Sequence, residues 1–186
     1  MKELSLNILD IAENSVKAKA DRIEISLLEK EDRTLLLSII DNGCGMDAET
    51  LAKVTDPFFT TRTTRPVGMG ISLLKLAAEQ TGGWLTIDSV SEKDNAAEHG
   101  TTLRALFHTD HVDCVPTGDV ISTLITLIQG SPDINFVYEH KTPGGEVRLV
   151  TDELRQVLGE VPLNSFEVLQ WIEEYLKEQY EAIHNS

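Results

Sequence analysis

The stretch TLLLSIIDNGCGM, residues 34–46, is the part of the chain that best indicates how it folds. Its first seven residues are almost all apolar, which predicts a buried strand over residues 34–40. The Asp-Asn-Gly-Cys-Gly run that follows has the composition of a turn. Alternating apolar residues over 21–28 predict a second strand, and the charged turn at 29–33 predicts that the two strands form an antiparallel hairpin.

Periodicity predicts further elements on both sides of this hairpin. Apolar residues three and four apart predict a helix over residues 3–18. After the hairpin we expect a short helix capped by Asp47, with Leu51 and Val54 inward. Further helices and strands are predicted to the end of the chain. They are a helix over 70–81, strands over 84–90 and 101–108, a helix over 119–129, strands over 133–140 and 145–150, a helix over 152–158, and a final helix with Val168, Ile172, Tyr175 and Leu176 inward. Asn164 or Ser165 is expected to cap this final helix.

The charge of the chain is acidic and uneven. The 186 residues carry 16 Lys+Arg and 31 Asp+Glu, a formal net charge of −15. Residues 1–109 hold 12 bases and 17 acids, whereas residues 110–186 hold 4 bases and 14 acids. His, Asp, Pro and Gly cluster near residues 108–118, so we expect one domain over 1–109 and a small acidic α+β domain over 118–186.

Composition also excludes several classes of protein. Each phosphate contact needs a local cation, so a chain this acidic is not expected to bind nucleic acid or an anionic membrane. The chain has only two cysteines, Cys44 and Cys114, too few for a framework of disulfides or for a cysteine-based set of metal ligands. No apolar run is long enough to span a bilayer, and the N-terminus does not resemble a signal peptide. The sequence therefore predicts a cytoplasmic protein.

One window breaks the acidic trend. Residues 57–78 contain no Asp or Glu but hold Arg62, Arg65 and Lys75. Within this window Gly-Met-Gly at 68–70 precedes a predicted helix, and free N–H groups at a helix start favour phosphate. We expect an anionic ligand here.

Polar residues on the first helix and after the buried strand suggest what this ligand is. Asp10 and Asn14 are four apart and Lys17 follows three later, so all three share one face. A carboxylate, an amide oxygen and an ammonium suit Mg²⁺ and phosphate, although a solvated polar face has the same pattern. Asp41, at the end of a buried strand, can accept a hydrogen bond from an amino group such as that of adenine. The same residues could equally form a plain turn.

The order and spacing of five segments resemble the Bergerat-fold (GHKL) ATPase superfamily. This superfamily includes gyrase, heat-shock chaperone ATPases, histidine kinases and mismatch-repair ATPases. The segments lie between about residues 3 and 108 and are DIAENSVK (10–17), DNGCG (41–45), DPFFTTR (56–62), GMGI (68–71) and GTT (100–102). The resemblance implies a histidine-kinase-like ATP-binding domain. It further implies a two-layer α/β sandwich, with a mixed, largely antiparallel sheet and helices on one face.

The resemblance also implies roles for particular residues, with ATP and Mg²⁺ as cofactors. Asn14 would hold Mg²⁺, Lys17 and Arg62 would contact phosphate, and Asp41 would bind the adenine amino group. The remaining implied contacts are with the nucleotide. Gly43, Gly45 and Met46 would shape the adenine pocket, Phe58 belongs to a phenylalanine box, Gly68, Met69 and Gly70 would meet the phosphates, and Thr102 would close the adenine side.

The branches of the superfamily carry different residues at the position of the catalytic base. ATPases and anti-sigma serine kinases of the superfamily carry Glu four residues before the Mg²⁺-binding Asn, and histidine kinases usually carry Asn. This chain carries Asp10 there. Aspartate can act as a base but reaches less far, and Glu13 is a weaker alternative. Asp10 as catalytic base and Asp10 as a partner of Mg²⁺ both stay open.

Three functions follow as hypotheses. The first is a stand-alone Mg-ATP-binding protein that hydrolyses ATP slowly or transfers phosphate in trans, because no phosphoacceptor segment precedes the ATP motifs. The second is a non-catalytic ATP-sensing module, and the third is an anti-sigma-type serine kinase. The acidic C-terminal part would contact a protein partner. Its helix at 119–129 is apolar almost all round, so it should pack against the first domain or a second subunit of a homodimer.

Overall fold

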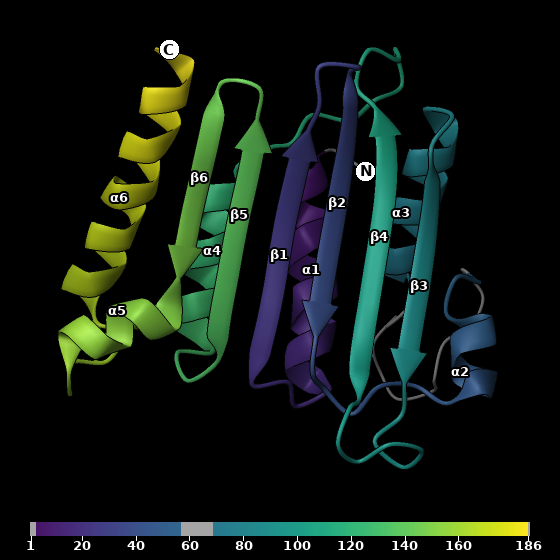
Figure 1. Cartoon of the computed structure of the whole chain (residues 1–186), viewed down its shortest axis with the longest axis horizontal. Helices are drawn as coiled ribbons and strands as arrows, with labels where there is room; N and C mark the ends of the chain where they lie inside the picture. Colours follow the sequence, from purple (N-terminus) through teal and green to yellow (C-terminus); the bar gives the residue numbers. More distant parts are fainter. Residues whose placement is uncertain (1–2, 57–68, 186) are drawn as a thin grey trace.

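The computed structural model describes residues 3–56 and 69–185, which form a six-stranded sheet with helices on one side (Figure 1). The strand order is β3-β4-β2-β1-β5-β6. Neighbouring strands are antiparallel except β1 and β5, which run parallel. The strands are β1 (Arg22–Glu29), β2 (Thr34–Asp41), β3 (Trp84–Val90), β4 (Gly100–His108), β5 (Asn135–Thr142) and β6 (Gly145–Val150).

Helices α1, α3 and α4 lie behind the sheet in Figure 1, and α6 runs beside β6. In the described part of the chain, no helix has both the length and the apolar character needed to cross a membrane. The helices are α1 (Leu4–Lys17), α2 (Ala48–Lys53), α3 (Met69–Gln80), α4 (Val120–Gly130), α5 (Thr151–Leu158) and α6 (Phe166–His184).

Side-chain alternation places the core between the sheet and these helices. On the hairpin, Ile25 lies opposite Ile39 and Leu27 opposite Leu37, and all four are at most 2% exposed. Successive side chains of a strand point to opposite faces, so these residues all face α1, whose Ile8 is fully buried. The antiparallel hairpin and the two-layer α+β fold are thus confirmed. The cap of α2 is confirmed as well, because the Asp47 side chain accepts from the Thr50 N–H at 2.7 Å.

The C-terminal helix differs from the prediction at two positions. Val168, Ile172 and Leu176 are buried as expected, but Tyr175 is 36% exposed and stacks on Trp171. Tyr175 lies three residues after Ile172, at the side of the buried stripe rather than on it. At the start of α6, Ser165 occupies the predicted cap position without making a side-chain cap hydrogen bond.

The C-terminal part joins the rest of the molecule directly. Strand β5 extends the sheet beside β1, and α4 packs against α1 and α6. The backbone carbonyls of Pro116 and Thr117 accept from the N–H groups of Leu4 and Ser5 at 2.9 and 2.8 Å. They therefore satisfy free donors at the start of α1, which has no side-chain cap. The predicted packing of the apolar helix against the first part is confirmed, while the division into two domains stays a prediction.

A buried hydrogen-bonded chain strengthens this junction. The two His140 ring nitrogens lie 2.7 Å from a Glu29 carboxylate oxygen and 2.7 Å from the Tyr180 hydroxyl. The Tyr180 hydroxyl is also 2.7 Å from that of Tyr138. Burial raises the pKa of Tyr138 well above its usual value and that of Tyr180 to about 12. Both hydroxyls therefore stay protonated and can donate at neutral pH.

Candidate functional site

Helix α1 presents a polar stripe beside its buried face. Asn7, Asp10, Asn14 and Lys17 are spaced by three, four and three residues, which places them along one side of the helix. Asn7 is only 4% exposed, Asn14 is half-buried, and Asp10 and Lys17 are exposed. The side chains of Asp10 and Asn14 make no hydrogen bond to any of residues 3–56 or 69–185. Two oxygen-bearing groups are therefore available on this stripe.

The start of α3 lies against the same stripe. The Asn7 side-chain amide donates to the backbone carbonyl of Gly70 at 3.4 Å. A Cβ atom added to Gly70 would lie 3.3 Å from the Asp10 Cβ and 3.8 Å from an Asp10 carboxylate oxygen. The helix that begins at Met69 therefore brings its N-terminal N–H groups near Asp10. Sequence reasoning missed Asn7, although it shares the spacing of the stripe.

Asp41 occupies the other end of the site and is held by two hydrogen bonds. One carboxylate oxygen accepts from the Ser15 hydroxyl of α1 at 2.6 Å, and the other accepts from the Gly43 N–H at 2.9 Å. Each carboxylate oxygen can accept a further bond, so Asp41 can still bind an amino group. Ser15 is the second residue that the sequence did not identify, since its serine looks like part of the ordinary helix pattern.

The two glycines of the turn are required by the packing of the protein itself. A Cβ on Gly43 would lie 2.8 Å from both the Cβ and the carbonyl oxygen of Ala18. Gly45 has φ +67°, and a Cβ there would lie 1.9 Å from the Val90 carbonyl oxygen. The turn is thus wedged between the end of α1 and the end of β3. The sequence predicted a turn and close ligand approach at these glycines, but not their packing against Ala18 and Val90.

Ser89 connects the turn to the start of β4. Its hydroxyl accepts from the Met46 N–H at 2.8 Å, and it lies 3.0 Å from the Gly100 carbonyl and 2.8 Å from the Thr101 hydroxyl. The His99 ring also binds this region, because its Nδ1 is bonded to the carbonyl of Gly43. These links fix the glycine turn against the last predicted motif.

The register of β2 and β4 distinguishes two neighbouring threonines, Thr101 and the predicted Thr102. Thr101 lies opposite Asp41, and Thr102 lies opposite Ile40. Directly opposed residues point to the same face, so Thr101 faces the same side as Asp41 and Thr102 faces the other side of the sheet. Thr101, the neighbour of the predicted Thr102, is therefore the threonine on the Asp41 side of the sheet. A sequence cannot fix this without the strand register.

The remaining predicted residues are only partly described. Phe58, Arg62 and Gly68 lie outside the described residues. Among the described residues, no group of three or more His, Cys, Asp or Glu side chains could hold a metal ion. Mg²⁺ does not need such a group, because it commonly takes one or two protein oxygens together with substrate phosphates. The oxygens of Asp10 and Asn14, which bond to none of the described residues, fit that requirement.

A comparison with protein families identifies the family of this chain. Residues 2–111 match the model of the histidine kinase-, DNA gyrase B- and HSP90-like ATPase family, so the chain belongs to this family. The matched segment contains the α1 stripe, the Asp41 turn and the start of α3. The chain therefore carries a GHKL ATP-binding domain, as the sequence predicted.

Curated relatives include three bacterial sensor kinases. The chain is 38% identical to the Escherichia coli histidine kinase AtoS over 39% of this chain and 12% of AtoS. It is 44% identical to FleS of Pseudomonas aeruginosa over 31% of this chain and 14% of FleS. It is 30% identical to YxdK of Bacillus subtilis over 58% of this chain and 33% of YxdK. The chain thus spans at most a third of these relatives.

Solved structures share the fold at low sequence identity. The Aquifex aeolicus MutL ATPase domain, solved with ADP, has a TM-score of 0.55 and 15% identity. The match covers 85% of this chain and 69% of that domain. The N-terminal domain of a DNA repair protein has a TM-score of 0.53 and 20% identity, covering 80% of this chain and 51% of that one. Both matches extend beyond the family segment, so the shared architecture includes part of the C-terminal region.

Proposed function

We propose that this chain binds Mg-ATP between the α1 stripe, the Asp41 turn and the start of α3. The observation that carries the proposal is a pair of oxygen-bearing side chains on α1, Asp10 and Asn14, which bond to none of the described residues, with Asp10 directly beside Gly70. A carboxylate and an amide on their own would suit many ligands. Next to a helix start, in a member of an ATPase family, they favour a metal-bound phosphate.

The phosphate end of the nucleotide would lie along α1 and α3. The Asn14 side-chain oxygen would hold Mg²⁺, which supplies charge neutralisation to the phosphates when it is bound. Lys17 would contact phosphate from the same stripe, and Met69 and Gly70 would present backbone N–H groups. Arg62, Gly68 and Phe58 keep the phosphate and lid roles predicted for them from the sequence.

The adenine end would lie at the turn. Asp41 would accept from the adenine amino group while Ser15 and the Gly43 N–H hold its carboxylate in place. Gly45 and Met46 would line the pocket through their backbone. Thr101 takes the role first assigned to Thr102, because it faces the same side as Asp41.

The proposed chemistry is slow hydrolysis of ATP or transfer of its terminal phosphate to a separate protein. In hydrolysis, Asp10 would take a proton from the attacking water. The acidic C-terminal part would contact the protein partner, and α4 is the surface for the alternative, a homodimer. We propose the cytoplasm as the compartment, because Cys44 and Cys114 are both free thiols.

A second candidate function is ATP sensing without turnover. It is favoured by the identity of Asp10, whose side chain is one methylene shorter than the Glu that the resemblance assigns to active ATPases. A base that cannot reach the water gives no proton transfer, since geometry comes before pKa in base catalysis. In this case nucleotide binding would change only the affinity for a partner.

Calorimetry with Mg-ATP tests the binding proposal. Asn14→Ala and Asp41→Asn should each weaken binding, and Glu31→Gln in the exposed β1–β2 turn serves as the control. Unchanged affinity in both site variants would reject the site. Phosphate release then separates the two functions: loss of turnover in Asp10→Asn supports a base, whereas no turnover in the wild type supports the sensor.

A further inference from the structure

Helix α6 carries an exposed pair of stacked aromatic rings. Trp171 and Tyr175 are four residues apart, and their ring centroids lie 5.0 Å apart with planes inclined by only 9°. The helix buries Val168, Ile172 and Leu176, yet Trp171 keeps 49% of its surface exposed and Tyr175 36%. Such large rings are enriched at protein interfaces, where they provide contact area at low entropic cost.

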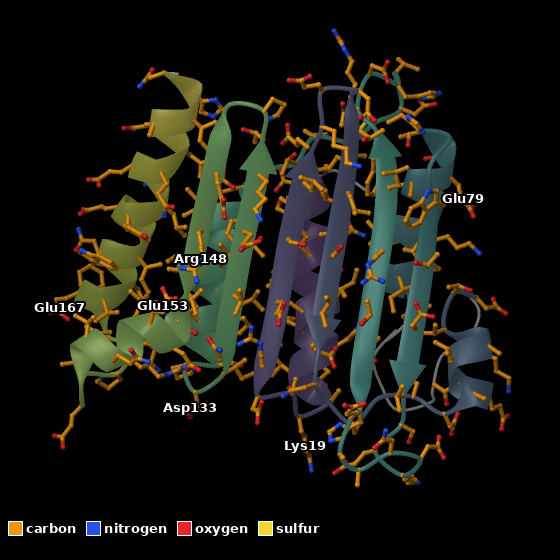
Figure 2. All side chains as sticks on the ribbon, in the orientation of Figure 1. Lys19, Glu79, Asp133, Arg148, Glu153 and Glu167 are labelled. Atoms are coloured by element: carbon orange, nitrogen blue, oxygen red, sulfur yellow. The ribbon has the colours of Figure 1, made fainter. Side chains whose placement is uncertain are left out.

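Three glutamates lie beside these rings. Glu167 is four residues before Trp171, Glu174 is three residues after it, and Glu178 is three residues after Tyr175. Residues at these spacings are neighbours on a helix surface. Figure 2 shows Glu167 on the outer side of α6, away from the sheet. We call these five residues the aromatic–acidic strip.

The carboxylates of the strip outnumber the bases near them, since Lys177 is the one base whose charge acts on Glu174 among the described residues. Within residues 3–56 and 69–185, none of the three glutamates forms an ion pair. Lys177, the one lysine of α6, bonds to Glu173 at 2.6 Å. Arg148 on β6 pairs with Glu153 of α5 instead, and the two point toward one another in Figure 2. The strip therefore keeps a local negative charge next to an exposed aromatic surface.

We propose that the aromatic–acidic strip binds a basic segment of a partner protein, with an Arg or Lys side chain lying on the stacked rings between the carboxylates. A cation over an aromatic face is attracted by the ring quadrupole, and nearby carboxylates add to this attraction. The proposal rests on the partner contact proposed above, while the nucleotide site plays no part in it.

The negative charge of the strip disfavours nucleic acid, anionic lipid and a second copy of the chain as its binding partner. Nucleic acid and anionic lipid would be repelled by the strip and by the net charge of −15. A second copy that used the same surface would bring the same glutamates face to face, because a two-fold interface pairs identical patches. A basic partner is the occupant whose charge complements the strip.

The test uses the full chain without nucleotide and follows its two tryptophan indole N–H signals by NMR. The probe is the peptide acetyl-Leu-Arg-Leu-Arg-Leu-Arg-amide, compared with the same peptide carrying neutral citrulline in place of arginine. Trp84 on β3 is 41% exposed, close to the exposure of Trp171, and so serves as an internal control. The arginine peptide should shift the Trp171 signal saturably and leave the Trp84 signal in place.

Paired variants separate the strip from general charge attraction. Glu174→Gln with Glu178→Gln should weaken binding by about fivefold. Glu31→Gln with Glu92→Gln changes the net charge by the same amount at exposed loop positions. This control pair should leave binding of the arginine peptide unchanged. The citrulline peptide should also bind at least about fivefold more weakly than the arginine peptide. The amide spectra show that each variant keeps its fold.

Three results would overturn the proposal: equal shifts at both tryptophans, equal losses in the two paired variants, or no saturable shift at about 1 mM arginine peptide. None of these results bears on ATP binding, because the strip and the nucleotide site are measured separately.

Discussion

At the α1 stripe, the side chains of Asp10 and Asn14 make no hydrogen bond to any described residue, whereas at the junction of β1, β5 and α6 the side chains of Glu29, His140 and Tyr180 bond to one another. Both sites combine carboxylates with nitrogen- or oxygen-bearing groups. The difference is that the junction satisfies its own polar groups, while the α1 stripe leaves them for a ligand. The first arrangement contributes to stability, and the second can contribute to function.

The largest expected effect is on the stability of the junction. His140→Ala removes an imidazole that is only 5% exposed and leaves Tyr180 and Glu29 without their common partner. We expect the free energy of unfolding in urea to fall by about 3 kcal/mol. Asn14→Ala, the matched change at the open stripe, should cost less than about 0.5 kcal/mol. Equal losses in the two variants would remove the contrast between the sites.

Alkaline pH should reveal the same buried junction. In the folded protein the pKa of Tyr180 is about 12, whereas an unfolded tyrosine has a pKa of about 10. The contribution of Tyr180 to the free energy of unfolding is therefore fully present below about pH 10, and it is lost as the pH rises through about 12. Tyr180→Phe should flatten this decline, and the exposed Tyr175→Phe should not. The measurement is urea unfolding at pH 8 and pH 11, and an identical decline in both variants would contradict the prediction.

Ser15 tests the link between packing and the nucleotide site. Ser15→Ala removes the donor that holds one Asp41 carboxylate oxygen at 2.6 Å. Mg-ATP affinity should fall by about fivefold to tenfold, because a hydrogen bond to a charged group is worth about 1.5–3 kcal/mol and water can replace part of it. Ser26→Ala on the open face of the sheet is the control for calorimetry. An affinity within twofold of the wild type would mean that Asp41 is positioned without Ser15.

The smallest expected effect compares two helix caps of the same chemistry. The Asp119 side chain accepts a hydrogen bond from the Ser122 N–H at the start of the well-buried α4. Asp119→Ala should therefore lower the free energy of unfolding by about 1 kcal/mol. Asp47 caps α2, which has no buried residue, so Asp47→Ala should leave the urea midpoint unchanged. Hydrogen bonds from Ser122 lower the pKa of Asp119, so its contribution is present above about pH 4 and is lost as the pH falls further. Equal midpoint shifts at pH 7 would contradict this ranking.

Local patterns were sufficient to predict most of the helices and strands. The alternation of Ile23, Ile25 and Leu27 and the cap at Asp47 depend on neighbours in the sequence, and both were predicted correctly. Tyr175 was misplaced because it lies at the side of a buried stripe, where a periodic pattern does not distinguish a core residue from an exposed one. The packing around Gly43 and Gly45 was also beyond a local pattern.

Long-range pairing explains what the sequence could not predict. The parallel contact of β1 with β5 joins strands that are far apart in the chain, and no motif specifies it. The choice of Thr101 over Thr102 depends on the register of β4 against β2. Ser15, Ser89 and Asn7 were missed because their importance lies in hydrogen bonds to distant residues. Motif residues could be listed from the sequence, but the groups that hold them could not.

The most direct test of the account is the Mg²⁺ dependence of ATP binding in the wild type and in Asn14→Ala. We expect Mg²⁺ to strengthen ATP binding by the wild-type chain at least tenfold, because the open stripe supplies an oxygen ligand to the metal. In Asn14→Ala, calorimetry should give about the same affinity with Mg²⁺ as with a chelator, while the fold is retained. An unchanged Mg²⁺ effect in Asn14→Ala would contradict the claim that the unbonded side chains of α1 form the metal side of the site.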